Sequence, residues 1–455
     1  MDNILDIEVF KEKLFKKAAL RGFSDWEIYY TSSTSFDAQI LNGEVREYKN
    51  SSHKGVSFRG TFNGKTGYSY TEKITEDAIE IIVSAAKENA IIKEEDEKHE
   101  ILFSGSESYE KVQGISNKLN EKTAQEKINL AKEMEQIAIK LDNRIVAVDH
   151  CVVASGEGSI LLANSTGLNL RHDSGVVACS VVVRAVSGKS TKVGAKAWCG
   201  LDFTTLNTQQ ISKEAVRKAI TMLGATSIKS GNYNIILENK IATNFLSIFI
   251  KNFFAENVQK GFSLLKDKVG KKIATDKLTI TDSISHPLSI RNIPFDSEGV
   301  AIKSKNVIQN GVLKTYLYNL KSAKKDGVSS TGNGYKPSFK SSVGTDINNF
   351  FVEPGTLSFK GILINFSGLV ITNIMGLHSG ASPISGDFSL QAEGFLLENG
   401  KIIQPVEQIT IAGNFYDVLN NIEEIASDLY FNVFGQSIGS PSLLINGLKV
   451  SGSGG

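Results

Sequence analysis

The sequence is poor in cysteine and proline. Its 455 residues include three cysteines and seven prolines, against 40 glycines. Cys151, Cys179 and Cys199 show no C-x-x-C spacing, so the sequence predicts reduced thiols, as in cytoplasmic proteins, and no disulfide framework. The few prolines argue against long rigid linkers, whereas the many glycines indicate tight turns between strands.

Long apolar runs are also missing. The most apolar segment, which starts at Ile241, is interrupted by Asn244, Ser247 and Lys251. It falls short of the ~20 apolar residues that a membrane span needs. The N-terminal segment carries charges every few residues and lacks the apolar core of a signal peptide. We therefore expect a soluble, cytoplasmic protein without a membrane partner.

Charge of one sign does not dominate. Lys plus Arg number 50 and Asp plus Glu number 49, which gives a formal net charge of +1. Such a balance offers no electrostatic footprint for nucleic acid, so no nucleic-acid partner is expected. A chain of 455 residues can bury a large core and divide into two domains.

The first half alternates helical and strand patterns. Apolar residues recur at helical spacing over residues 7–19 and from Thr75, and T-x-x-E at Thr123 predicts a capping box for a helix that runs to about Leu141. A fourth helix is expected over about 208–223. Asn-Gly pairs at residues 42–43 and 63–64 are typical hairpin turns, and residues 145–198 read as further strands.

The second half is mostly strand and turn. Helices are expected only over 242–257 and about 415–426, among short strands with glycine turns. The sequence therefore predicts an α+β protein of two domains, with the boundary at a turn over residues 229–232. Residues 1–228 would form an N-terminal domain of helices with an antiparallel sheet. Residues 229–455 would form a mostly antiparallel, barrel-like β domain.

Nucleotide and nucleophile motifs are missing as well. STGNGYKP, from Ser330, contains G-x-G but lacks both the dinucleotide and the P-loop spacing, so a plain turn is expected. No G-x-S-x-G elbow occurs, and Cys179 sits in an apolar, strand-like run typical of a small core residue. The residues thus indicate no catalytic nucleophile.

The six histidines do not form a zinc motif. No two are close in sequence, whereas a helix-borne zinc site needs two imidazoles about one turn apart and a carboxylate for the bound water. An alternative cluster would combine His150, Cys151, His172 and Cys179, at a spacing that fits no known zinc pattern. His378 is a lone loop histidine. We expect no metal and no cofactor in this chain.

Three segments resemble one known family. They are FDSEGVAIKSKNVIQNGVLKTYLYNLKSAKKDGVSSTGNG from Phe295, SGDFSLQAEGFLLENGKIIQPVEQITIAGN from Ser385, and GSPSLLINGLKVSG near the end. They are similar to the C-terminal half of the TldD/PmbA metallopeptidases, also called modulators of DNA gyrase. NGEVREYKNSSHKGVSFRGTFNGKTGYSYT matches the first half more loosely. The resemblance makes Asn333, Gly334, Gly386, Asp387 and Phe388 candidate peptide-binding or structural residues.

The resemblance also implies which subunit type this is. The TldD type carries H-E-x-x-x-H on a helix early in the C-terminal half, and a cysteine near the C-terminus. The corresponding helix here, Ala242–Asn257, has no histidine, and FNVFGQSIGSPS, from Phe431, has no cysteine. The chain therefore resembles the metal-free TldE (PmbA) subunit. Its partner would be a zinc-bearing TldD-like chain, and the pair would cleave unfolded or small peptides and mature modified peptides.

Two other interpretations stay open. The chain could be a stand-alone homodimer that binds peptides as a carrier or regulator without protease activity. It could also be an enzyme of unrelated chemistry that uses Asp387, Glu393 or other carboxylates. Two carboxylates can do acid–base work only at a suitable separation. The peptide substrate and the catalytic partner are not specified by the sequence.

Overall fold

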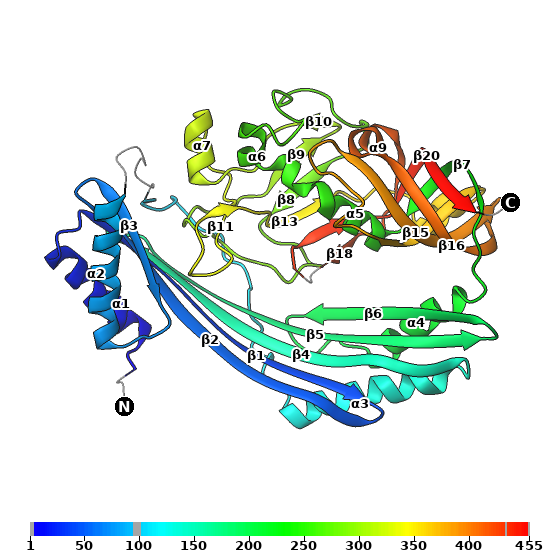
Figure 1. Cartoon of the computed structure of the whole chain (residues 1–455), viewed down its shortest axis with the longest axis horizontal. Coiled ribbons are helices and arrows are strands. Elements are labelled where there is room, and N and C mark those ends of the chain that lie inside the picture. Colours follow the sequence, from blue (N-terminus) through cyan, green and yellow to red (C-terminus); the bar gives the residue numbers. More distant parts are fainter. Residues whose placement is uncertain (1–3, 94–101, 433–434, 454–455) are drawn as a thin grey trace.

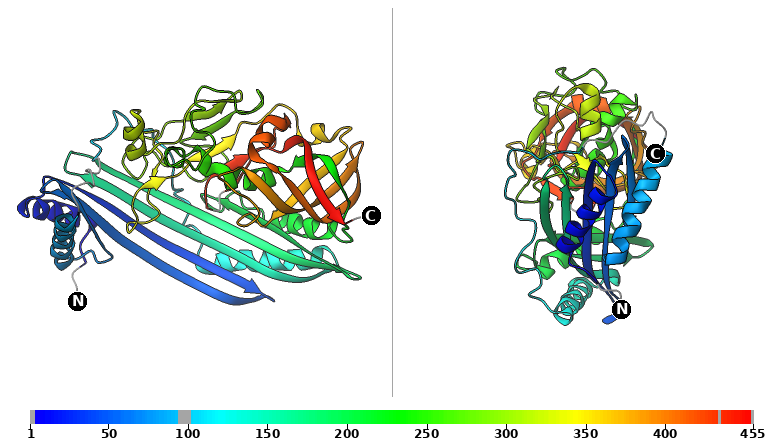
Figure 2. Two further views of the ribbon diagram at one scale, coloured as in Figure 1. Left: turned by 45° about the horizontal axis from the view of Figure 1, so that its top comes forward. Right: turned by 90° about the vertical axis from the view of Figure 1, so that its left-hand side faces the viewer.

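A computed structural model describes residues 4–93, 102–432 and 435–453. Within these residues, the first half is built on one long, curved, antiparallel sheet (Figures 1 and 2). Its strand order is β3-β2-β1-β4-β5-β6, so β3 and β6 are the edge strands. The strands are β1 (Asp25–Leu41), β2 (Glu44–Phe62), β3 (Lys65–Thr71), β4 (Ile145–Asn164), β5 (Asn169–Ser187) and β6 (Ser190–Gly200).

Two tight turns fix the register of this sheet. Asn42 and Gly43 join β1 to β2, and Asn63 and Gly64 join β2 to β3. All four residues have positive φ, between 48° and 80°. Asparagine and glycine tolerate that conformation best, which is why Asn-Gly pairs favour two-residue hairpins. Both predicted hairpins are confirmed.

Four helices cover one face of the sheet, at its two ends. They are α1 (Ile7–Leu20), α2 (Glu76–Ile92), α3 (Ala124–Leu141) and α4 (Thr208–Thr221). Alternate residues of β1 face them: Ile28 is buried with α1 and α2, and Ile40 with α3 and α4. The Thr123 capping box is present, with Thr123 Oγ1 accepting from Glu126 N at 3.3 Å. The four predicted helices are confirmed to within two residues.

A small β-barrel dominates the second half. Its strands are ordered β16-β15-β14-β7-β20, and pairing of β16 with β20 closes the barrel. Only β7 and β14 run parallel. The bounds are β7 (Lys229–Leu237), β14 (Gly368–Met375), β15 (Asp387–Glu398), β16 (Lys401–Asn414), β20 (Leu443–Ser453), with β17 (Ile422–Ile425) beside β20. The α+β class with a barrel-like second half is confirmed.

A second sheet packs beside the barrel, in the order β10-β9-β8-β13-β19-β18. Its strands are β8 (Ile280–Ser283), β9 (Lys305–Gln309), β10 (Val312–Leu313), β13 (Asn349–Val352), β18 (Tyr430–Asn432) and β19 (Ile438–Ser440). β11 (Gly334–Tyr335) pairs with β12 (Gly344–Thr345). The short helices are α7 (Leu320–Asp326), α8 (Phe359–Leu363) and α9 (Phe415–Asn421). One apolar core joins barrel and sheet, with Phe249 stacked on Phe415 at 4.3 Å between ring centroids.

Several predicted elements of the second half are wrong in detail. The helix expected over 242–257 is three short pieces, α5 (Asn239–Phe249), η1 (Ile250–Phe253) and α6 (Ala255–Gln259). It breaks because Phe254 is extended and its neighbours bond to Leu317: Leu317 N donates to Phe253 O and Ala255 N to Leu317 O.

The other corrections have similar causes. The helix expected to reach Ala426 ends at Asn421, because Ile422 and Ile425 pair with β20 and are buried there. Residues 229–232 belong to β7 and not to a turn, because β20 pairs with them. Among the described helices, none is long and apolar enough to cross a membrane.

Candidate functional site

A cleft of about 480 Å³ lies between the curved sheet and the second half. The face of the sheet that lies opposite its helices forms one wall, through Tyr29, Thr31, Ser33 and His53. The other wall comes from loops around β11 and β13. Its polar residues include Arg291, Asp296, Asn333, Tyr335, Lys336, Asp346 and Asn348. Polar groups from both halves therefore meet around one cavity, the usual setting of a binding site.

One loop, residues 336–340, borders the cleft and docks on the sheet. Lys336 Nζ donates to Ser57 Oγ at 3.2 Å and lies over the ring of Tyr29, 4.6 Å from its centroid. Phe339 covers Gly55 so closely that a Cβ on Gly55 would stand 2.2 Å from its ring. Lys340 pairs with Glu72 at 2.6 Å. These contacts of the loop hold the two halves together beside the cleft.

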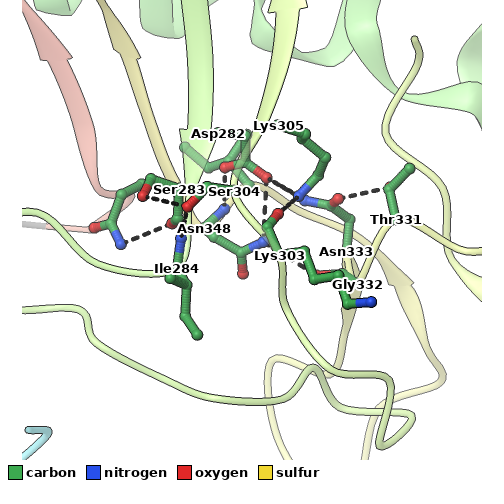
Figure 3. A network of polar contacts seen from close by, with 12 residues as sticks. Asp282, Ser283, Ile284, Lys303, Ser304, Lys305, Thr331, Gly332, Asn333 and Asn348 are labelled. Atoms are coloured by element: carbon green, nitrogen blue, oxygen red, sulfur yellow. Dashed lines mark hydrogen bonds and ion pairs between the residues drawn. The ribbon is translucent and has the colours of Figure 1, made fainter. Parts of the chain in front are cut away.

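A buried carboxylate organises the floor of the cleft (Figure 3). Asp282 is fully buried, and it accepts hydrogen bonds from Asn333 Nδ2 at 2.8 Å and from Asn348 N at 2.8 Å. Lys305 Nζ lies 3.0 Å from the same carboxylate. A buried charge is tolerable only when it is paired and hydrogen-bonded. Asn333 therefore has a structural role, and its amide fixes the loop that carries it.

A second buried carboxylate pair lies beside Asn333. Asp296 accepts from the backbone N–H groups of Gly334, Glu298 and Val300, at 2.8 to 3.0 Å. Glu298 accepts from Leu320 N at 2.7 Å. Burial raises the pKa of Glu298, and the negative charge of Asp296 raises it further. Burial also raises the pKa of Asp296, and the hydrogen bonds from the three backbone N–H groups counteract part of that rise.

This carboxylate pair was not predicted from the sequence as a feature of the site. Asp296 and Glu298 stand in the D-S-E-G turn that carried the family resemblance, so the signal was in the sequence. Their burial and their contacts depend on Gly334 and Leu320, which lie 38 and 22 residues away from their partners. Only the folded chain brings these groups together.

The five candidate residues from the sequence fall in two places. Asn333 and Gly334 lie at the cleft, whereas Gly386, Asp387 and Phe388 start barrel strand β15. The exposed carboxylate of Asp387 accepts from Asn414 Nδ2 at 3.0 Å, which holds its pKa below the usual value. Phe388 is a core residue, 5.0 Å from Phe245 between ring centroids. The structure does not bring the two sets together.

Both glycines of that set stand where a larger residue would be strained. A Cβ on Gly334 would lie 2.5 Å from Glu298 Oε2, so the constraint is close approach. Gly386 has φ +83°, a conformation that favours glycine, and its Cβ would lie 2.9 Å from Tyr416. The carboxylates Asp387 and Glu393, named for the acid–base alternative, are six residues apart on β15, or about 20 Å along a strand.

The alternative histidine–cysteine cluster does not form. Val153 pairs with Cys179 and Ile160 pairs with His172, so these side chains are spread along β4 and β5. His378 is exposed in the loop after β14, and His99 lies outside the described residues. In the parts of the chain that the structure covers, no three His, Cys, Asp or Glu side chains are placed to hold a metal ion.

The two segments that would carry zinc ligands in the TldD type do lie together. Helix α5 packs against β18 and β19, and Thr243 Oγ1 lies 3.5 Å from Tyr430 O. None of the described residues of α5, β18 and β19 is a histidine, cysteine, aspartate or glutamate. The nearby carboxylate of Asp428 is already bound by Asn239 and Ser442. Glu256, in α6, is already bound by Asn319 and Thr345. This donor set does not fit zinc, which takes Cys, His and carboxylate ligands.

Three family models match the chain, all of PmbA/TldA metallopeptidases. They are domain 1 over residues 26–90, the central domain over 117–223 and the C-terminal domain over 230–452. Among curated relatives, the metalloprotease PmbA of Escherichia coli O157:H7 is 30% identical over 332 residues, which is 72% of this chain and 70% of that protein. A TldD homologue of Buchnera aphidicola (from Acyrthosiphon pisum) is 25% identical over 94% of this chain and 92% of its own length.

Solved structures share the fold over the whole chain. A Thermotoga maritima protein, described as a candidate modulator of a DNA gyrase, matches with TM-score 0.91 and 32% identity, over 98% of this chain and 100% of that one. TldE from Thermococcus kodakarensis matches with TM-score 0.90 and 22% identity, over 97% and 100%. At that identity the second match shows the fold alone.

Proposed function

The chain belongs to the PmbA/TldD metallopeptidase family, and from this premise we propose that it is the metal-free, TldE-like subunit of a two-chain zinc peptidase. The observation that carries the proposal is the junction of α5 with β18 and β19. The segments that hold zinc in the TldD type meet there, but the described side chains of this junction include buried apolar groups such as Ala242, Phe431 and Ile438. Chemistry on an activated water would therefore come from the partner chain.

In this role the chain would hold the peptide. Strand β6 is an edge strand, and no described residue outside the sheet makes a backbone hydrogen bond to Thr191–Gly200. Such an edge can accept an extended peptide through main-chain bonds, which read little sequence. The face of the sheet beside it carries small, half-exposed side chains, such as Ala154, Ala178 and Ala197. That face leaves room for peptide side chains of many sizes.

The proposed partner is a zinc-bearing TldD-like chain, bound through the second half. Large apolar side chains are exposed there, including Ile364 at 70%, Ile402 at 62% and Ile403 at 54%. Exposed apolar groups of this kind are typical of contact surfaces. A cytoplasmic location is part of the same proposal, and the three unpaired cysteines support it.

The test is co-purification with the H-E-x-x-x-H homologue of the same cell, followed by peptide cleavage assays of each chain and of the mixture. We expect a stable complex and cleavage by the mixture that exceeds the sum of the separate chains. A chain that stays monomeric by light scattering, alone and mixed, would refute the subunit role. A chain that forms only homodimers and binds peptides without cleavage would instead establish the carrier function.

A further inference from the structure

Arg291 places in the cleft between the two halves a guanidinium that has an ion-pair partner but no hydrogen bond to a described residue. Its side chain is 22% exposed, and it lines the cavity of about 480 Å³. Two hydrogen bonds hold the backbone of Arg291 in place. Arg291 N donates to Ser289 Oγ at 3.0 Å, and Arg291 O accepts from Asn349 Nδ2 at 2.8 Å. The side chain is therefore held at the cavity by a well-anchored backbone.

The guanidinium itself makes no hydrogen bond to any residue that the structure describes. Its nearest acidic partner is Asp346, with 3.9 Å between Nη1 and Oδ2, beyond hydrogen-bond distance. Its Cζ atom lies over the ring of Tyr335, 5.4 Å from the centroid, a cation–π contact that helps to hold the group at the cavity. Five N–H donors in a mostly buried position normally find acceptors. Here the residue lines the cavity and its guanidinium has no hydrogen-bonded acceptor among the described residues.

The carboxylates around the cavity are already engaged. Asp296 takes three backbone N–H groups. Asp346 accepts from Ile347 N at 2.9 Å and from Gln436 Nε2 at 2.5 Å, and its other oxygen faces Arg291. An incoming ammonium group could reach the Oδ2 atom of Asp346, which accepts no hydrogen bond from a described residue, but the neighbouring charge of Arg291 would repel it. An incoming carboxylate would find a planar fork of donors that matches it in both shape and charge.

We propose that Arg291 is a carboxylate-binding residue of the interdomain cleft and that it anchors a carboxylate of the bound peptide. The inference rests on the proposed role in holding peptides and names one group that the site recognises. The carboxylate can be the C-terminus of the peptide or an acidic side chain. In both cases Arg291 makes a bidentate, charge-assisted pair with it, in a cleft partly shielded from water.

The experiment measures the binding of three fluorescent peptides by anisotropy, with the chain in the assembly in which it purifies. One peptide has a free C-terminus and no acidic residue, the second is its C-terminal amide, and the third is that amide with one internal glutamate. Arg291→Gln removes the charge and Arg291→Lys keeps it without the fork. Arg171→Gln is the matched control, because Arg171 is an exposed arginine 3.5 Å from Asp173 on β5.

We expect the free-acid peptide to bind roughly tenfold to a hundredfold more tightly than the amide, the range of a charge-assisted hydrogen bond. Arg291→Gln should abolish that difference, Arg291→Lys should restore part of it, and Arg171→Gln should leave it unchanged. Tight binding of the glutamate-bearing amide would assign the carboxylate to a side chain, and weak binding would assign it to the C-terminus.

A measurement on the unchanged chain avoids any effect of the variants on folding. An arginine-selective dicarbonyl reagent, with mass spectrometry of the digested chain, should show Arg291 protected by the free-acid peptide and Arg171 not protected. Equal binding of all three peptides, with no protection of Arg291 by any of them, would overturn the carboxylate assignment while leaving the peptide-holding function intact. Failure of all three peptides to bind would overturn both.

Discussion

Gly334→Ala tests whether the cleft is built on the contact between Gly334 and the buried Glu298. The new methyl group would stand 2.5 Å from Oε2, 2.8 Å from Cγ and 2.9 Å from Cδ of Glu298. Overpacking of this kind costs about 1–3 kcal/mol. Displacing the carboxyl group, whose raised pKa keeps it mainly neutral at pH ~7, would also weaken its bond to Leu320 N, worth about 0.5–1.5 kcal/mol. We expect a total loss of about 3 kcal/mol.

Gly344→Ala is the matched control. Gly344 pairs with Tyr335 in the same two-stranded ribbon, and the nearest atom to its added Cβ is 4.0 Å away. It should change stability by less than ~1 kcal/mol. The assay is urea unfolding followed by circular dichroism, with hydrogen exchange of peptides that contain Leu320 as a local readout.

A double variant isolates the contact. Glu298→Ala removes the side chain that the methyl group would strike. The Gly334→Ala/Glu298→Ala double variant should therefore be no less stable than Glu298→Ala alone. Two results would refute a steric contact between residue 334 and Glu298. One is a Gly334→Ala variant that is as stable as Gly344→Ala, and the other is a double variant in which the two losses of stability add.

Three further predictions concern local features. Thr123→Ala should lower the free energy of unfolding by about 1 kcal/mol, because it removes a formed capping box. Thr75→Ala removes an N-cap that makes no side-chain hydrogen bond, so it should lower the free energy of unfolding by less. Thermal unfolding of the two variants compares these losses. Gly386→Ala should cost about 1–2 kcal/mol from its φ of +83°, and a wild-type urea midpoint would show this reading to be wrong. The pKa of Glu298 is raised in the folded state, so its contribution to stability declines as pH rises through and above the usual carboxyl range. Glu298→Gln should therefore gain stability relative to wild type between pH ~5 and pH ~8. Urea titrations at several pH values that give a constant difference in unfolding free energy between the two proteins would contradict this.

Local signals predicted the first half of the chain well. The Asn-Gly turns and the Thr123 capping box depend on neighbouring residues only, so the sequence shows them directly. The prediction of one continuous helix over 242–257 was wrong. Its apolar pattern continues through Phe254, but there the backbone pairs with the distant Leu317, which overrides helix propensity. The same competition turned residues 422–425 into a strand beside β20.

The site was harder to predict than the fold. Asn333 and Gly334 were named from the family resemblance, and the structure places them at the cleft. Arg291 carries no local motif, and its importance comes from contacts with Tyr335 and Asp346 that no spacing in the sequence reveals. Conversely, Phe388 was named with the motif but lies in the barrel core.

The central claim, that this chain is the metal-free member of a zinc peptidase pair, is tested most directly by elemental analysis of the purified chain and of its complex with the H-E-x-x-x-H homologue. The account predicts no stoichiometric zinc in the chain alone and about one zinc per pair in the complex, the content of a single catalytic site. About one zinc per chain in the chain alone, lost when a histidine or cysteine of this chain is replaced, would contradict it.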